Sequence, residues 1–314
     1  MGAADVVPGV SGGTIAFITG IYQELLDSIS SINLDSLKLL LKGKFKEFWK
    51  AVNGTFFLFL LAGIFFSILT LSKFISEIVS SPEETKEKVL LWSFFFGLIC
   101  ASIIYVGKQI KEWNLIKVVS LILGAGIAFY ITIASPATGS DSYAYIFLAG
   151  FIAICAMILP GISGSFILLL MGAYPIVLGS IKDLLSALKD GDSALIIDNG
   201  ITIGVFATGC IIGLLSFARL VSFLFKKAPE ITLAVLTGFL VGSLNKVWPW
   251  KNTTEFRVNS DGDKIPYLQK NLSPSGFAEI HSDNYLFAVI GLTILGFALV
   301  FAIEYLGSKM AKED

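Results

Sequence analysis

Six stretches of this chain are each long and apolar enough to cross a membrane as a helix, and they limit the fold more than any other feature. A spanning helix needs about 20 predominantly apolar residues. Charged residues make up only 15% of the sequence, whereas soluble domains contain about 25%. The sequence therefore predicts an all-α polytopic membrane protein, and its net charge of −1 gives no reason to expect a nucleic-acid partner. The predicted spans are residues 54–76, 89–108, 115–135, 200–223, 230–248 and 284–307.

Two further apolar regions, 1–29 and 143–181, are interrupted by Pro-Gly pairs. Lysines predominate in segment 30–52, which places it in the cytoplasm, whereas aspartates predominate in 182–199 and place it outside. The charges of the connecting segments can place them alternately inside and outside only if each interrupted region enters and leaves the membrane on the same side. We therefore predict two re-entrant helical hairpins, with cytoplasmic N- and C-termini. Residues 33–50, with apolar side chains at helical spacing opposite lysines, predict an interfacial helix.

The two interrupted regions share a motif. PGVSGGTIAFITGIYQELLDSI at 8–29 aligns without a gap with PGISGSFILLLMGAYPIVLGSI at 160–181. Each copy precedes three predicted spans, and because three is an odd number, the second half must be inverted relative to the first. We predict a single membrane domain built from two inverted repeats, 1–142 and 143–314, an architecture typical of secondary transporters.

Each motif begins a helix at a glycine-serine turn, where backbone N–H groups without intrahelical partners and the helix dipole favour an anion. The hydroxyls add further donors, and the glycines permit close approach. We predict that both motifs bind one phosphate or carboxylate, with a guanidinium as the counter-charge. The alternatives are that these small residues serve only close helix packing and that Arg219 extends its guanidinium to the cytoplasmic interface. The predicted site residues are Gly9, Ser11, Gly12, Gly13, Thr14, Gly161, Ser163, Gly164, Ser165 and Arg219.

Asp5 immediately precedes the first motif and is the acid nearest to it. An acid at membrane depth is a candidate for proton or cation coupling, and a solvated carboxylate near Met1 is the alternative. We find no Ser-His-Asp set, no pair of acids at depth and no metal-ligand spacing. The sequence therefore favours a transporter over an enzyme and predicts neither a cofactor nor a metal.

The segments GAADVVPGVSGGTIAFITGIYQ, LPGISGSFILLLMGAY, FFFGLICASI and GSLNKVWPWK resemble the polyprenyl-phosphate transporter family, over essentially the whole chain. The resemblance implies a bacterial cytoplasmic-membrane protein that returns undecaprenyl phosphate from the outer to the inner leaflet for reuse in peptidoglycan and other envelope polymers. The implied partners are a polyprenyl phosphate lipid and the membrane. The resemblance leaves open whether the protein forms a homo-oligomer. A transporter of a small soluble anion is the alternative that the residues alone also allow.

Overall fold

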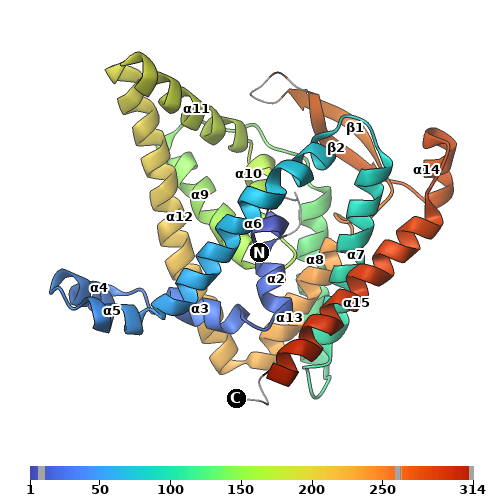
Figure 1. The fold of residues 1–314 in the computed structure, drawn as a ribbon, viewed down its shortest axis with the longest axis horizontal. Coiled ribbons are helices and arrows are strands. Elements are labelled where there is room, and N and C mark those ends of the chain that lie inside the picture. Colours follow the sequence, from blue (N-terminus) through green and yellow to red (C-terminus); the bar gives the residue numbers. More distant parts are fainter. Residues whose placement is uncertain (6–10, 259–261, 263, 311–314) are drawn as a thin grey trace.

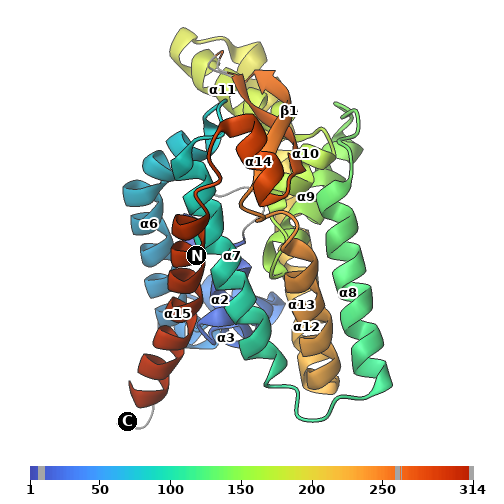
Figure 2. The same cartoon turned by 90° about the vertical axis from the view of Figure 1, so that its right-hand side faces the viewer.

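Helices make up most of the described structure, and a β-hairpin interrupts them near the C-terminus (Figures 1 and 2). The computed structural model describes residues 1–5, 11–258, 262 and 264–310. The helices of the first half are α1 Gly2–Asp5, α2 Gly12–Ile18, α3 Tyr22–Ser30, α4 Leu34–Leu41, α5 Phe45–Ala51, α6 Gly54–Ser80, α7 Lys86–Gly107 and α8 Leu115–Ile133. The elements of the second half are α9 Tyr143–Ile158, α10 Gly164–Leu170, α11 Tyr174–Asp190, α12 Ser193–Lys227, α13 Pro229–Ser243, β1 Lys251–Val258, β2 Lys264–Asn271, α14 Pro274–His281 and α15 Leu286–Met310.

Five of the described helices, α6, α7, α8, α12 and α15, are long and apolar enough to cross a membrane. They confirm the prediction of a multi-pass membrane protein. The span predicted at 230–248 is shorter than expected, because α13 ends at Ser243 and residues 244–247 form turns.

Two segments that the sequence indicated as connections are folded. Residues 182–199 belong to α11 and to the first turns of α12, a helix of 35 residues. At 1.5 Å per residue α12 is about 50 Å long, which exceeds the hydrocarbon thickness of about 30 Å. Residues 249–283 contain the β-hairpin and α14, which add a small two-stranded sheet to the mostly helical fold. Threonine, phenylalanine and valine favour the strand conformation in β1, a short-range signal unrelated to the length of apolar spans.

Both copies of the sequence motif form the same local structure. In the first copy α2 is followed by Gly20, with a φ of 76°, and then by α3. In the second copy α10 is followed by Gly172, with a φ of 64°, and then by α11. Only glycine adopts this left-handed conformation without a Cβ penalty, so each short helix ends just before its glycine. The axes of α10 and α11 differ by 104°, so the chain turns sharply there.

Helices of the first half pack closely on helices of the second half. On α7, a Cβ at Gly97 would overlap the carbonyl oxygen of Thr293 in α15, and a Cβ at Gly296 in α15 would overlap that of Phe94. Small residues allow such close backbone approach between membrane helices. The pair α7 and α15 therefore forms one glycine-based contact between the halves.

The pair α13 and α8 makes the corresponding contact. A Cβ at Gly238 in α13 would overlap the Leu121 carbonyl oxygen, and a Cβ at Gly124 in α8 would overlap that of Val235. Phe94 and Gly97 occupy the same places in FFFGLICASI as Val235 and Gly238 occupy in VLTGFLVGSL. The two interhelical contacts are therefore equivalent position by position.

The elements outside the helix bundle define its two ends (Figures 1 and 2). Helices α4 and α5 lie at one end with the C-terminal end of α15, and we call this the lysine-rich end. Helices α11 and α14 and strands β1 and β2 lie at the other, the β-hairpin end. Gly43, with a φ of 72°, divides the helix predicted at 33–50 into α4 and α5, whose apolar residues Leu34, Leu41 and Phe45 are exposed.

Candidate functional site

The two copies of the motif, far apart in sequence, touch each other. The Ser11 hydroxyl donates a hydrogen bond to the Met157 carbonyl at 2.9 Å. The Gly161 N–H donates to the Thr14 hydroxyl at 2.8 Å. Gly13 packs so closely that a Cβ there would lie 2.5 Å from the Ile158 carbonyl oxygen. The structure thus brings together the predicted residues Ser11, Gly13, Thr14 and Gly161, whereas Gly9 lies outside the described residues.

In the first motif the chain itself supplies the acceptors for the amides at the start of α2. The Gly12 N–H donates to the Asp5 carboxylate at 2.6 Å, and the Gly13 N–H donates to the Ser11 hydroxyl at 3.0 Å. Asp5 thus lies at the helix start where the sequence predicted a bound anion.

The second motif is arranged differently. The hydroxyls of Ser163 and Ser165 lie 2.9 Å apart, and no side chain caps the first turn of α10. Gly164 packs against the Ala153 carbonyl, 2.6 Å from the position of a Cβ. Ser163 is buried, whereas Ser165 is half-buried and lines a cavity. Donors of the second motif are therefore more available to a ligand than those of the first.

Arg219 lies elsewhere. Its guanidinium donates to the carbonyl of Ile32, just beyond α3, at 2.5 Å. In the same region the Ser222 hydroxyl donates to Asp27 at 2.5 Å, and Lys226 pairs with Asp27 at 3.1 Å. These contacts join α12 to the end of α3, so the structure does not place Arg219 with the motif residues.

The cavity beside Ser165 is lined by basic residues that the sequence analysis did not single out. Its volume is 190 Å³, and a neighbouring cavity of 350 Å³ shares Lys246 as a lining residue. Elements from both halves form the first cavity, because Lys88 lies in α7, Ser165 in α10 and Arg257 in β1. The cavity lies near the β-hairpin end, and Lys251 lines its neighbour.

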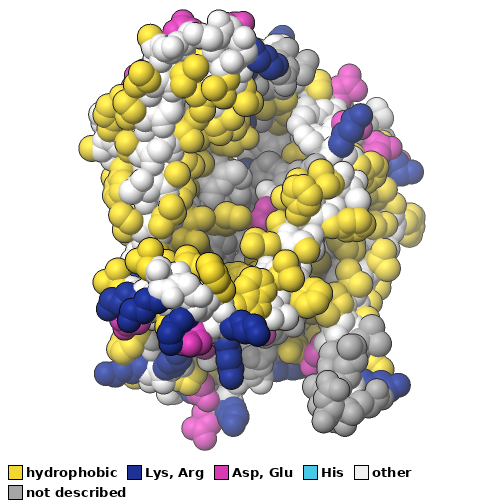
Figure 3. All heavy atoms as spheres, turned by 60° about the vertical axis from the view of Figure 1, so that its left-hand side comes forward, with side chains coloured by type: hydrophobic (Ala, Val, Ile, Leu, Met, Phe, Trp, Pro, Cys, Tyr) yellow, Lys and Arg dark blue, Asp and Glu magenta, His cyan; other side chains and the backbone are white. Residues whose placement is uncertain are grey.

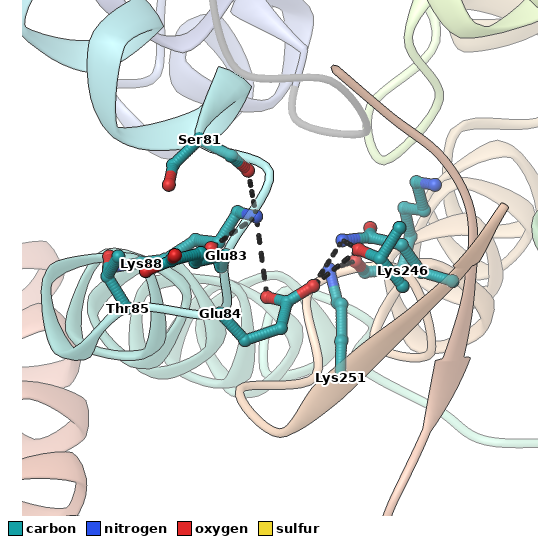
Figure 4. A network of polar contacts seen from close by, with 9 residues as sticks. Ser81, Glu83, Glu84, Thr85, Lys88, Lys246 and Lys251 are labelled. Atoms are coloured by element: carbon teal, nitrogen blue, oxygen red, sulfur yellow. Dashed lines mark hydrogen bonds and ion pairs between the residues drawn. The ribbon is translucent and has the colours of Figure 1, made fainter. Parts of the chain in front are cut away.

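One carboxylate sits among these lysines (Figure 4). Glu84 points between Lys88 on one side and Lys246 and Lys251 on the other. Its carboxylate lies 3.4 Å from the Lys88 ammonium, which also donates to the carbonyls of Ser81 at 2.8 Å and Glu83 at 3.2 Å. The ammonium of Lys251 donates to the Lys246 carbonyl. Glu84 therefore compensates the charge of Lys88 but leaves the remaining cations in excess.

The environment of Lys251 disfavours its charged form. Its side chain is only 2% exposed. Burial, with a further contribution from the neighbouring Lys246, lowers the pKa of Lys251 well below its ordinary value. An anion close to Lys251 would oppose this effect by favouring the ammonium.

These basic residues are scattered through the sequence, and only Lys246 and Lys251 had a local signal. They flank the tryptophans in KVWPWK, which are typical of a membrane interface. The indole N–H groups of Trp248 and Trp250 donate to the carbonyls of Leu272 and Asn284, which anchors this segment. Lys88 and Arg257 carry no such signal, because only the fold brings them near Lys246.

Comparison with known proteins places the chain in a family. Residues 1–265 match the model of the family described as VCA0040-like, undecaprenyl phosphate translocase-like. The chain belongs to this family. It is 46% identical over 312 residues to the polyprenyl-phosphate transporter of Vibrio cholerae serotype O1, covering 98% of this chain and 94% of the relative.

A more distant relative also aligns over most of the chain. The polyprenyl-phosphate transporter of Staphylococcus aureus is 31% identical over 263 residues, covering 79% of this chain and 83% of the relative. No solved structure matches. The resemblance inferred from the motifs is thus confirmed by relatives from two bacteria.

The hydrogen bond between the two motifs has a measurable role in stability. Replacing Thr14 with valine keeps the shape of the buried side chain but leaves the Gly161 N–H without its acceptor. Because an unsatisfied buried donor costs about 1–3 kcal/mol, we expect a lower unfolding temperature in detergent. Thr14→Ser retains the hydroxyl and serves as the control. Equal unfolding temperatures for Thr14→Val and the wild type would contradict a contribution from this bond.

Proposed function

We propose that this protein moves a polyprenyl phosphate, undecaprenyl phosphate in particular, from the outer to the inner leaflet of the bacterial cytoplasmic membrane. The observation that carries the proposal is the direct contact between the two motifs, in a chain whose relatives are named polyprenyl-phosphate transporters. A site made by both halves of a membrane protein is accessible from either side when the halves move relative to each other.

The proposed architecture is a pair of inverted repeats, 1–142 and 143–314, each with a re-entrant hairpin. Its support is the position-by-position equivalence of the α7–α15 and α13–α8 contacts, together with the glycine-terminated helices of both motifs. Rocking of these units about the touching motifs would expose the site alternately to the two leaflets. In the proposed orientation the lysine-rich end, with both α4 and α5, faces the cytoplasm.

The surface supports a lipid rather than a fully hydrated substrate. Figure 3 shows a hollow in the side of the molecule between α6 and α12, above α4 and α5, with hydrophobic side chains on both flanks. On α6, apolar residues such as Phe59 and Phe66 are exposed. A phosphate cannot cross hydrocarbon unaided, whereas a polyprenyl tail never needs to leave it. A lateral opening allows the phosphate to move inside the protein while the tail stays in the membrane.

Inward movement of the phosphate requires a driving force. Carrying one negative charge against an inside-negative potential costs about 2.3 kcal/mol per 100 mV. In the proposed mechanism Asp5 couples this step to a proton or sodium ion. Its carboxylate accepts a hydrogen bond from the Gly12 N–H. A phosphate at the first motif would therefore be repelled by the negative charge of Asp5 unless Asp5 is neutralised.

The proposal is tested with purified protein in vesicles that contain undecaprenyl phosphate in both leaflets. A phosphatase added outside hydrolyses only the outer-leaflet lipid. We expect the protein to make the inner-leaflet pool hydrolysable as well, faster when an ion gradient favours movement of that pool outward. Protein-free vesicles are the control, and Asp5→Asn is expected to remove the response to the gradient.

Two results would contradict this function. Hydrolysis that stops at the outer-leaflet fraction, as in protein-free vesicles, would exclude translocation of the lipid. Uptake of labelled inorganic phosphate without translocation of the lipid would favour a transporter of a small soluble anion instead.

A further inference from the structure

Three basic side chains near the β-hairpin end are held by aromatic rings instead of carboxylates. The Lys246 ammonium lies 4.2 Å from the centre of the Phe166 ring, and the Lys251 ammonium lies 3.4 Å from that of Trp92. The Arg257 guanidinium lies 4.8 Å from the centre of the Tyr174 ring. The three rings come from α10, α7 and α11, so the arrangement depends on the tertiary fold.

An aromatic ring positions a cation without neutralising it. The ring attracts the cation through its quadrupole and carries no net charge. Within the described residues, none of the three basic side chains forms an ion pair with a carboxylate. Glu84 lies beside the cluster (Figure 4), and its ion pair is with Lys88. The cluster therefore keeps a positive charge that an anion can use.

The polar groups of this cluster point to a ligand. The buried Nε of Arg257 has no partner within the described residues, and the half-buried Lys246 ammonium lies against the Phe166 ring. Burying a charge or a donor without a partner is costly. Both side chains line the 190 Å³ cavity, together with Ser165, which supplies an uncharged donor. The cavity thus combines excess positive charge with unused donors.

We propose that this cavity, lined by Ser165, Lys246 and Arg257 with Lys251 behind it, binds a phosphomonoester at the β-hairpin end of the protein. A phosphomonoester carries up to two negative charges and presents three acceptor oxygens, which suit an arginine fork and an ammonium. The ligand is the headgroup of a polyprenyl phosphate or a free phosphate. The lipid identity rests on the proposed function, in which this is the site that receives the headgroup from the outer leaflet.

Ligand binding at this site would involve a proton. Lys251 faces Lys246, Lys88 and Glu84, and burial beside Lys246 favours its neutral form. A bound phosphate favours the ammonium, so binding is linked to the protonation of Lys251. Above pH 7 the phosphomonoester itself is already mostly dianionic, since its second pKa is about 6. We therefore expect binding to weaken as the pH is raised from 7 and to depend on the ionisation enthalpy of the buffer.

The test is calorimetric titration of the full-length protein in detergent micelles, with farnesyl phosphate as the probe. We expect Lys246→Gln and Arg257→Gln to bind at least about tenfold more weakly, since hydrogen bonds to charged groups contribute an effect of this size. Lys264→Gln removes an exposed lysine at the start of β2, outside this cavity, and is the matched control. Lys246→Arg retains the charge and should retain binding, and unfolding temperatures check that each variant is folded.

Two further ligands identify the source of the phosphate. Farnesol lacks the charge and should not bind. Inorganic phosphate that displaces farnesyl phosphate at equal concentration identifies a free-phosphate site, whereas failure to displace it identifies a lipid headgroup site. Unchanged affinity in folded Lys246→Gln and Arg257→Gln, or equal binding of farnesol, would overturn the proposal.

The vesicle assay separates this proposal from the proposed function. If the wild type translocates the lipid, and both variants bind and translocate as well as the wild type does, the proposed cavity site is refuted and the proposed function stands. If the variants lose farnesyl phosphate binding but the wild type does not translocate the lipid, the proposed function is refuted and the anion site stands.

Discussion

Replacing Gly97 with alanine is expected to force α7 away from α15 and to destabilise the folded protein by about 3 kcal/mol, the upper part of the range for overpacking. A Cβ at this position would overlap the backbone carbonyl of Thr293, which cannot move as a side chain can. Gly238→Ala should have a comparable effect, because its Cβ would meet the Leu121 carbonyl in the equivalent contact. The measurement is thermal unfolding in detergent, together with the yield of folded protein.

Gly126→Ala is the matched control. This glycine lies on α8, two residues from the tightly packed Gly124, and a Cβ there would have nothing within 4 Å. Because alanine is favoured over glycine within helices by about 1 kcal/mol, the control should be neutral or slightly stabilising. The prediction is wrong if Gly97→Ala and Gly126→Ala change the unfolding temperature in the same direction and by the same amount.

Replacing Glu84 with glutamine is expected to destabilise the β-hairpin end by about 3 kcal/mol. The Glu84 and Lys88 side chains are only 6% and 1% exposed, and removing one partner of a buried ion pair leaves an uncompensated charge. Thr253 and Gln269 of the β-hairpin also hydrogen-bond to this carboxylate. The change should therefore lower the unfolding temperature and increase exchange of backbone amides in β1 and β2.

Glu87→Gln provides the comparison, because Glu87 is an exposed acid in the first turn of α7. It should alter the unfolding temperature little, as expected for an exposed charge. Combining Glu84→Gln with Lys88→Met should cost less than the sum of the two single changes, since the double variant has no unpaired charge at this position. Strict additivity would show that Glu84 acts mainly through its contacts with the β-hairpin.

Sequence reasoning was most successful where the determining pattern is local. A run of about 20 apolar residues specifies a membrane helix wherever it occurs, so the five long spans could be recognised. The Pro-Gly motifs were equally recognisable, and their shared turns at Gly20 and Gly172 follow from the conformational freedom of glycine. By contrast, the β-hairpin at residues 251–271 lies in a polar segment that the search for spans treated as a loop.

The same distinction between local and tertiary information applies to the residues of the predicted anion site. Thr14 and Gly161 could be paired because the motif is repeated, and the structure brings them into contact, whereas Ser11 bonds to Met157 just before the second copy. Arg219 was chosen for its charge within an apolar run, but its position against Ile32 depends on how α12 crosses the end of α3. A single residue within a helix carries no sequence signal for which neighbour it will meet.

The sequence by itself determined that this chain spans a membrane several times, contains two copies of one helix-breaking motif and belongs to a transporter family, because apolar length and repeated motifs are encoded locally. Only the tertiary structure decided which charges share a cavity. Lys88, Ser165, Lys246 and Arg257 come from four separate elements, and their proximity follows from the packing of both halves and the placement of the β-hairpin. The electrostatic potential at a bound anion depends on its distance in space from each charge, and the separation of residues along the chain does not give these distances.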